Sequence, residues 1–319
     1  MTPVLGCEKD TKMRNSSLFG ALTLAVSFPV CASAQQDGGL DIVVTGERSL
    51  ESNAIRDAVR DMSSNQRFDE PLVRFHDPVC LAVSGLGRVA SNYVVERMAG
   101  NARAAGVPIA DEGCRPNALV LIVDDPVTLV ARIQETQPRL ISRAKSRQLD
   151  AALARGETVL VWHNEEPRGE DGEALRVSSN VPGMPVTGPF SQLAAETHIN
   201  THGRARRIDV AGSRAVINGV VILNIERLVD MDLERVADYA TMRLLAPGMQ
   251  AARQIDVAAE EPASGGPQTI LEPFVAGRGV ERMTSFDRAW LSALYDLAPN
   301  AGATRLPGAV AQMYASDEE

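Results

Sequence analysis

Apolar residues recur at helical spacing in the second half of the chain, and this pattern predicts the best-defined element. The segment Ile222–Pro247 begins as the end of a strand and continues as one helix, Leu233–Leu245. Asp232 can accept hydrogen bonds from the first free amides, and Pro247 stops the helix. One face of this helix is apolar enough to pack against a sheet. Its apolar positions are Leu233, Val236, Ala237, Ala240 and Leu244.

Upstream, strand and helix patterns alternate from Pro71 onward. The predicted strands are Pro71–Phe75, Val79–Val83, Ala118–Val123 and Thr158–Trp162, followed by a hairpin of Arg204–Val210 and Ala215–Leu223. The predicted helices are Ser49–Met62, Arg88–Ala105, Val127–Gln134, Arg139–Leu153 and, near the end, Phe286–Leu297 with Ser285 as its cap. The acidic segment Asn164–Glu173 is expected to be a loop. We therefore expect an α+β fold with a mixed sheet, packed helices and a C-terminal helix that closes over the core.

Composition excludes some partners. The chain is 45% hydrophobic, carries a net charge of −9 and contains no strongly basic segment. Such a chain lacks the basic surface that binds nucleic acid or anionic lipid. We expect no nucleic-acid partner.

The first residues have the pattern of an export signal. Lys12-Met13-Arg14 is basic, Leu18–Val30 is apolar but too short to span a bilayer, and Ala32-Ser33-Ala34 supplies small residues. We expect a Sec-type signal peptide over residues 1–34 with cleavage after Ala34, translation starting at Met1 or Met13, and a periplasmic or secreted protein without a membrane span. Residues 35–67 would form a tail and a helix, and residues 68–319 one globular domain.

Two cysteines follow the leader, Cys80 and Cys114. An even pair in an oxidising compartment predicts a disulfide, whereas a redox or zinc pair would need C-x-x-C spacing. Closing that loop would stabilise the fold by about 3–4 kcal/mol in the chain-entropy model.

Gly85–Ala90 (GLGRVA) fits a dinucleotide-binding fingerprint between a strand and a helix. Val107–Ala110 would then be the second strand, with Asp111 placed to bind a ribose. Pro108 would interrupt such a strand, and export in an unfolded state separates the protein from nicotinamide cofactors. We therefore expect no cofactor and keep a dinucleotide-binding oxidoreductase as a distant alternative.

His198 and His202 are four residues apart, the spacing that binds zinc on a helix. Asn200 and Thr201 favour a polar loop instead, and a third ligand such as His163 would have to come from elsewhere. We expect no metal, and keep this pair as the site of an alternative metal-dependent hydrolase.

Three segments together resemble an uncharacterised family of secreted alphaproteobacterial proteins with a zincin-like, metallopeptidase-like fold. They are Val220–Asn224, the helix Leu233–Leu245 and Thr284–Tyr295. The resemblance implies a sheet edge strand before an active-site helix, and a C-terminal helix after it.

The catalytic residues of that fold are not carried over. The resemblance places Ala237 and Thr241 where the zinc-binding imidazoles would be, and Asp238 near the place of the general base. Tyr239 retains a hydroxyl for a substrate hydrogen bond. We therefore expect a non-catalytic pseudoenzyme that binds a peptide, an envelope component or another protein, with a strand-binding groove beside Val220–Asn224.

Overall fold

The computed structural model describes residues 50–63, 70–138, 140–141, 143–157, 159–178, 197–199, 212–229, 231–250, 266–272 and 279–317. The chain divides into two units, Met1–Thr45 and Gly46–Glu319, and only the second contains described residues. The expected signal peptide with its cleavage after Ala34, His202 and the expected strand Arg204–Val210 lie outside the described residues. No helix among the described residues is both long and apolar enough to cross a bilayer.

The main sheet is built around one long strand, β7 (Ser213–Asn224). On one side, β7 pairs in parallel with β1 (Val73–Arg74) near its start and with β3 (Ala118–Val123) near its end, and β3 pairs in parallel with β2 (Leu81–Ser84). On the other side, β4 (Val159–Arg168) runs antiparallel to β7. A separate pair joins β5 (Arg176–Ser178) to β6 (Thr197–Ile199).

This pairing corrects the expected position of Val220–Asn224. The resemblance implies an edge strand before the helix, but these residues pair with β3 on one side and, as far as Leu223, with β4 on the other. Their backbone is therefore largely occupied, and the groove expected beside them is not a free strand edge. The strands of the main sheet that pair with one neighbour each are β4, β2 and the short β1.

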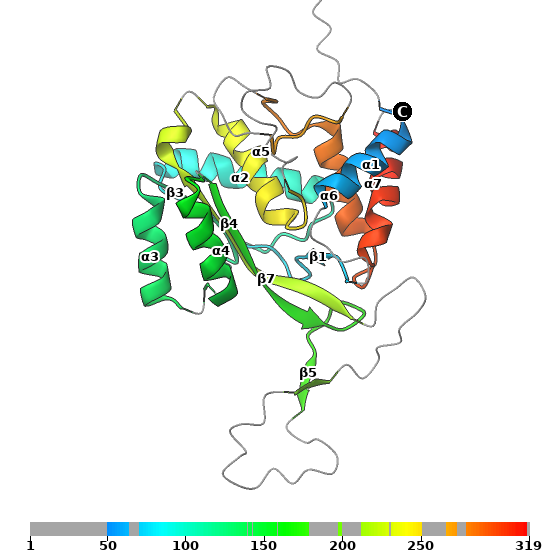
Figure 1. The fold of residues 1–319 in the computed structure, drawn as a ribbon, viewed down its shortest axis with the longest axis horizontal. Helices are drawn as coiled ribbons and strands as arrows, with labels where there is room; N and C mark the ends of the chain where they lie inside the picture. Colours follow the sequence, from blue (N-terminus) through cyan, green and yellow to red (C-terminus); the bar gives the residue numbers. More distant parts are fainter. Residues whose placement is uncertain are drawn as a thin grey trace, which may run out of the picture. The chain divides into compact units, whose positions relative to one another are not determined.

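Helices cover both faces of the sheet. On one face, α2 (Arg88–Ala104) and α5 (Leu233–Leu245) pack with Val221 and Leu223 in the larger core. On the other, α3 (Pro126–Thr136) and α4 (Arg143–Ala154) pack over Val220 and Ile222 in a smaller core (Figure 1). β7 is apolar on both sides because helices cover both, as in buried parallel strands.

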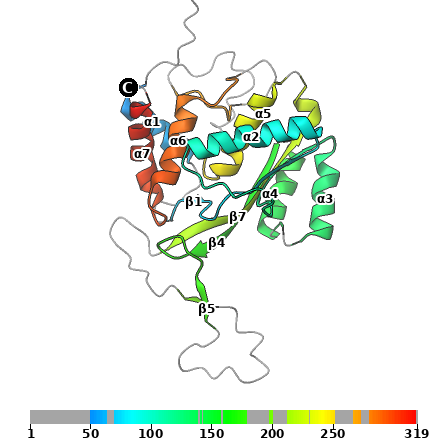
Figure 2. The same ribbon diagram turned by 180° about the vertical axis from the view of Figure 1, so that it is seen from behind.

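The remaining helices complete the larger core. α1 (Ser52–Met62), α6 (Ser285–Asp296) and α7 (Leu306–Ser316) lie together at one side of the sheet (Figures 1 and 2). The expected closing helix is confirmed as α6, although its cap is Thr284, in a capping box with Asp287, rather than Ser285. Two short 3₁₀ turns, η1 (Ile225–Arg227) and η2 (Ala303–Arg305), precede α5 and α7.

The predicted elements agree with the structure most closely where packing covers them. α5 and β3 have the predicted bounds, and α2 ends one residue early. The expected loop Asn164–Glu173 is wrong in its first half, because β4 continues to Arg168. Its acidic residues Glu165 and Glu166 remain paired across to β7, where Arg214 forms an ion pair with Glu165 at 3.0 Å. The ion pair with Arg214 balances the charge of Glu165, so an acidic segment that the sequence pattern assigns to a loop can form a strand.

Candidate functional site

The face of α5 that contains Ala237, Asp238 and Thr241, the positions that the resemblance compares with zinc ligands and a general base, is buried against another helix. Asp232 begins α5 by accepting a hydrogen bond from the Arg235 amide at 2.7 Å. Ala237, Asp238 and Thr241 then follow, each with an exposed fraction of 0%. The side chains at 238 and 241 point to α2, which packs along α5.

Both oxygens of the Asp238 carboxylate are occupied. Arg97 of α2 donates to them from Nε at 2.7 Å and from Nη2 at 2.8 Å, a paired geometry that a guanidinium favours. Asn101 donates from Nδ2 at 2.7 Å, and the Met283 amide donates at 3.0 Å. These contacts bind together α2, α5 and the chain entering α6.

The polar network continues from this buried carboxylate to the surface. Hydrogen bonding to Asp238 raises the pKa of Arg97 above its ordinary value. Arg97 also lies 3.4 Å from Glu234, which pairs with Arg282 at 2.6 Å and accepts a hydrogen bond from Tyr93 at 2.7 Å. Such a network fixes how two helices dock, because an unpaired partner inside it would be costly.

Tyr239 and Thr241 have local partners of their own. The Tyr239 hydroxyl accepts a hydrogen bond from Arg243 Nε at 2.9 Å, and the guanidinium of Arg243 lies 5.2 Å from the tyrosine ring centre. The Thr241 hydroxyl donates to the Ala237 carbonyl at 2.8 Å. Their hydrogen-bonding groups therefore serve the helix itself.

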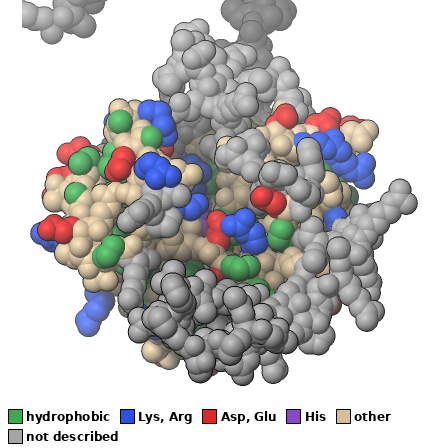
Figure 3. Space-filling view, turned by 60° about the horizontal axis from the view of Figure 1, so that its bottom comes forward, with side chains coloured by type: hydrophobic (Ala, Val, Ile, Leu, Met, Phe, Trp, Pro, Cys, Tyr) green, Lys and Arg blue, Asp and Glu red, His purple; other side chains and the backbone are tan. Residues whose placement is uncertain are grey.

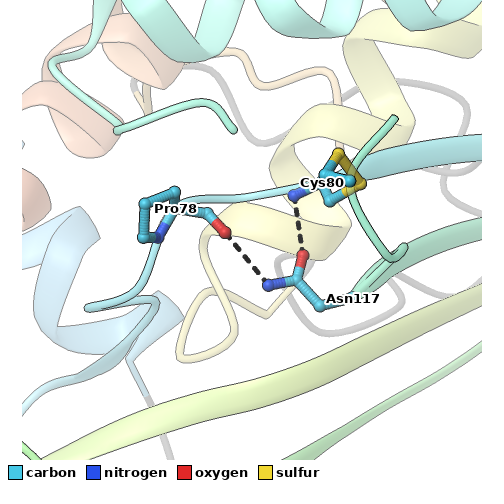
Figure 4. The surroundings of a disulfide bond; sticks show 4 residues. Pro78, Cys80 and Asn117 are labelled. Carbon is cyan, nitrogen blue, oxygen red and sulfur yellow. Dashed lines mark hydrogen bonds between the residues drawn. A yellow bond between two sulfur atoms is a disulfide. The ribbon is translucent and has the colours of Figure 1, made fainter. Parts of the chain in front are cut away.

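The predicted disulfide between Cys80 and Cys114 is present, with the two Cα atoms 6.0 Å apart. Asn117 lies beside it: its Oδ1 accepts from the Cys80 amide at 2.8 Å, and its Nδ2 donates to the Pro78 carbonyl at 3.1 Å (Figure 4). The disulfide and this amide together fix the start of β2 against the loop that precedes β3.

The glycine-rich turn is formed as predicted, between β2 and α2, but packing accounts for its first glycine. Gly85 has a φ of +103°, and a Cβ there would lie 1.8 Å from the carbonyl oxygen of Ile122. Asp111 does not approach this turn, because the adjoining Ile109 pairs with Val79 at the other end of the strand. Val79 and Gly85 are six residue steps apart along an extended chain, or roughly 20 Å.

Of the two histidines kept as an alternative metal site, only His198 is among the described residues. His198 lies in β6, opposite Val177 of β5. His163, the suggested third ligand, lies in β4 of the main sheet, where its Nε2 is 3.0 Å from the Leu244 carbonyl oxygen. Burial lowers the pKa of His163 to about 4, which keeps its ring neutral. Among the described residues, no group of three or more His, Cys, Asp or Glu side chains is placed to hold a metal ion.

A second charged cluster surrounds the buried Arg168 at the end of β4. Its guanidinium forms ion pairs with Asp77 and Glu166, both at 2.6 Å. The neighbouring His76 follows β1, and burial lowers its pKa to about 4. We assign this cluster to the anchoring of the chain after β1 against the end of β4.

Two pockets lie next to the sheet in the described part of the chain. One is an apolar pocket of about 190 Å³ at the carboxyl ends of the parallel strands, lined by Leu86 after β2, Val229 after η1 and Val236 of α5, among others. Val229 is 61% exposed there. The other is a cleft of about 380 Å³ beside β2, α2 and the disulfide loop. Ligand sites in open sheets of this kind favour the carboxyl ends of strands.

Charged side chains are mixed over the visible surface. Figure 3 shows blue and red side chains interspersed on one face, without a continuous basic area among the described residues. The net charge of −9 adds no attraction for polyanions.

Arg97 and Asn101 are the residues that sequence reasoning missed. Both lie on α2, four residues apart, and therefore on one face of the helix. Glu234 and Asp238 have the same spacing on α5. Two polar pairs at matching helical spacing, each within an otherwise packed helix, were the available signal for a charged helix–helix contact.

Comparison with protein-family models, with curated proteins and with solved structures finds no match for this chain.

Proposed function

We propose that this protein is an exported, non-catalytic zincin-like protein that binds a segment of another protein. The occupied Asp238 carboxylate is the observation that carries this proposal. A general base needs an oxygen within hydrogen-bond reach of a water or substrate proton. Both Asp238 oxygens already accept from Arg97, Asn101 or Met283, and the side chain is 1% exposed.

The side chains on either side of Asp238 support the same conclusion. The Ala237 methyl group cannot bind a metal, and the Thr241 hydroxyl is directed to a backbone carbonyl of its own helix. A catalytic zinc needs three protein ligands and an open position for water. Ala237, Asp238 and Thr241 are all fully buried, whereas such a water position would have to be open.

The order of elements supports the zincin-like part of the proposal. The outer strand β4 pairs antiparallel with β7, β7 leads through η1 into α5, and α6 closes over the core later in the chain. The departure is that β4, rather than β7, is the outer strand on this side. Export is supported by the disulfide, because disulfides persist in oxidising compartments.

Metal analysis and a hydrolysis assay test the non-catalytic assignment. The full chain would be produced in a host that exports it, purified in the presence of zinc, and measured for bound metal and for chelator-sensitive cleavage of casein. We expect zinc well below one equivalent and no chelator-sensitive cleavage. Stoichiometric zinc that is lost in His202→Ala, together with cleavage lost in the same variant, would instead establish the hydrolase alternative.

A further inference from the structure

The outer edge of β2 carries backbone groups without a partner among the described residues. The Val79 amide donates to Pro108 at 2.8 Å, and its carbonyl accepts from Ala110 at 2.9 Å, so Val79 faces outward. Cys80 faces inward, since its carbonyl accepts from Ala118 at 3.1 Å. Successive strand residues alternate between the two edges, which directs the backbone groups of Leu81 and Val83 outward.

The chain that begins to cover this edge leaves it early. Ile109 pairs with Val79 at a single bridge, and the chain then turns at Asp111 and is held near the start of β2 by the Cys80–Cys114 disulfide. Within the described ranges, β2 pairs with β3 alone. Edge strands are commonly protected by a covering segment, a proline or a bulge. From Leu81 to Ser84, the described residues supply none of these.

A cleft of about 380 Å³ lies beside the start of this edge, at Leu81. Its apolar lining comes from three elements: Leu81 of β2, Val95 of α2 and Ile109 of the disulfide loop. A strand placed along β2 would direct every second side chain toward this lining. The cleft therefore combines hydrogen-bonding groups with apolar surface, the two requirements of strand addition.

The charges around the cleft are unbalanced. Glu96, Asp111 and Glu112 contribute three carboxylates, and Arg103 contributes the one guanidinium among the lining residues. No ion pair joins any of these four side chains to another described residue. A ligand with Lys or Arg side chains would complement them, whereas an acidic ligand would be repelled.

We propose that β2 binds an extended peptide segment of a partner protein by strand addition, and that the segment presents both apolar and Lys or Arg side chains to the cleft. This inference rests on the proposed binding function and names its site. The outward amides and carbonyls of Leu81 and Val83 pair with the peptide backbone. Apolar peptide side chains contact Leu81 and Val95, and basic ones contact Glu96 and its acidic neighbours.

A phage-displayed library of random ten-residue peptides tests the proposal. The library is selected on the exported full chain and counter-selected on Val83→Pro. Proline removes one outward amide and leaves the inward ladder to β3 complete, a position that edge strands tolerate. We expect enriched sequences that carry Val, Ile or Leu and Lys or Arg two residues apart, on one face of an extended strand, and slower hydrogen exchange of the Leu81 and Val83 amides when a selected peptide is bound.

Affinities of matched variants supply the controls. Val83→Pro and Glu96→Lys should each weaken binding about tenfold or more, while Val83→Thr and the distant Glu135→Lys on α3 should leave it within about twofold. Because Glu96→Lys alters no backbone group, it tests the site even if Val83→Pro does not fold.

Three outcomes would overturn the β2 site. They are the absence of any enriched peptide, peptide binding that protects the amides of β4 instead, and protection of Leu81 and Val83 by self-association without peptide. Binding at β4 would leave the general binding function standing, whereas stoichiometric zinc with casein cleavage would remove the proposed function itself.

Discussion

The charged side chains on two faces of the same helix, α2, differ in whether they have partners in the fold. Arg97 and Asn101 turn toward α5 and meet the buried Asp238 in a closed set of hydrogen bonds. Their sequence neighbours Glu96 and Arg103 turn toward the cleft beside β2 and have no ion-pair partner among the described residues. Arg97 and Asn101 have partners within the protein that account for them, whereas Glu96 and Arg103 are available to a ligand.

Removing the buried carboxylate should have the largest effect. Asp238→Ala leaves Arg97, Asn101 and the Met283 amide without their acceptor, and breaking a buried pair of this kind costs about 3–5 kcal/mol. Urea unfolding followed by circular dichroism measures the loss. Replacing both partners, as in Arg97→Met with Asp238→Leu, should recover part of the stability. A loss below about 1 kcal/mol for Asp238→Ala would show that the network does not hold the helices together.

The second largest loss of stability is expected from substitutions in the glycine turn, and it should be larger at Gly85 than at Gly87. Gly85→Ala places a Cβ against the Ile122 carbonyl at a positive φ and should cost about 2–3 kcal/mol. Gly87→Ala meets no atom within 4 Å and is the matched control. A nicotinamide dinucleotide should shift the melting temperature of none of these proteins. Stabilisation by the cofactor that disappears in Gly87→Asp would support the dinucleotide alternative instead.

Asp287 is a buried carboxylate without an arginine, and this contrast with Asp238 predicts a pH effect. It accepts from the Ile270 amide at 2.8 Å and from the Thr284 amide at 3.0 Å. Burial nevertheless raises its pKa from 3.8 to about 6. The folded state therefore holds the proton more tightly than the unfolded state, and its contribution to stability, complete below pH 4, is lost as the pH rises through about 6.

The slope of this loss is on the order of 1 kcal/mol per pH unit. Comparing the free energy of unfolding of the wild type and Asp287→Asn between pH 4 and pH 7 isolates it. We expect the wild type to lose stability relative to the variant as the pH rises. Parallel pH profiles of the two proteins would show that Asp287 does not hold a proton in this range.

The smallest effect on stability is expected on the other face of α2. Glu96→Lys changes an exposed residue that has no ion pair with another described residue, and it should alter the free energy of unfolding by less than about 0.5 kcal/mol. Together with its expected loss of peptide binding, this would separate the binding face from the structural one. A destabilisation as large as that of Asp238→Ala would assign Glu96 to the fold instead.

Much of the local structure could be predicted from the sequence. The period of the apolar residues fixed α5 and β3 to the residue, and the number and compartment of the cysteines predicted the Cys80–Cys114 bond. These features depend on neighbouring residues or on simple pairing, which a linear pattern records. The leader pattern likewise predicts export by itself.

Only the tertiary structure decided which strand is central, which carboxylate is paired and which edge is open. The apolar run Val220–Leu223 predicts burial equally well at an edge or in the middle of a sheet, and pairing with both β3 and β4 made it central. Asp238 meets Arg97 across a separation of 141 residues, which no local period can report. Among the described residues, the edge of β2 after Cys80 has no paired strand because the chain turns away after Ala110, where the Cys80–Cys114 disulfide joins segments that are distant in sequence.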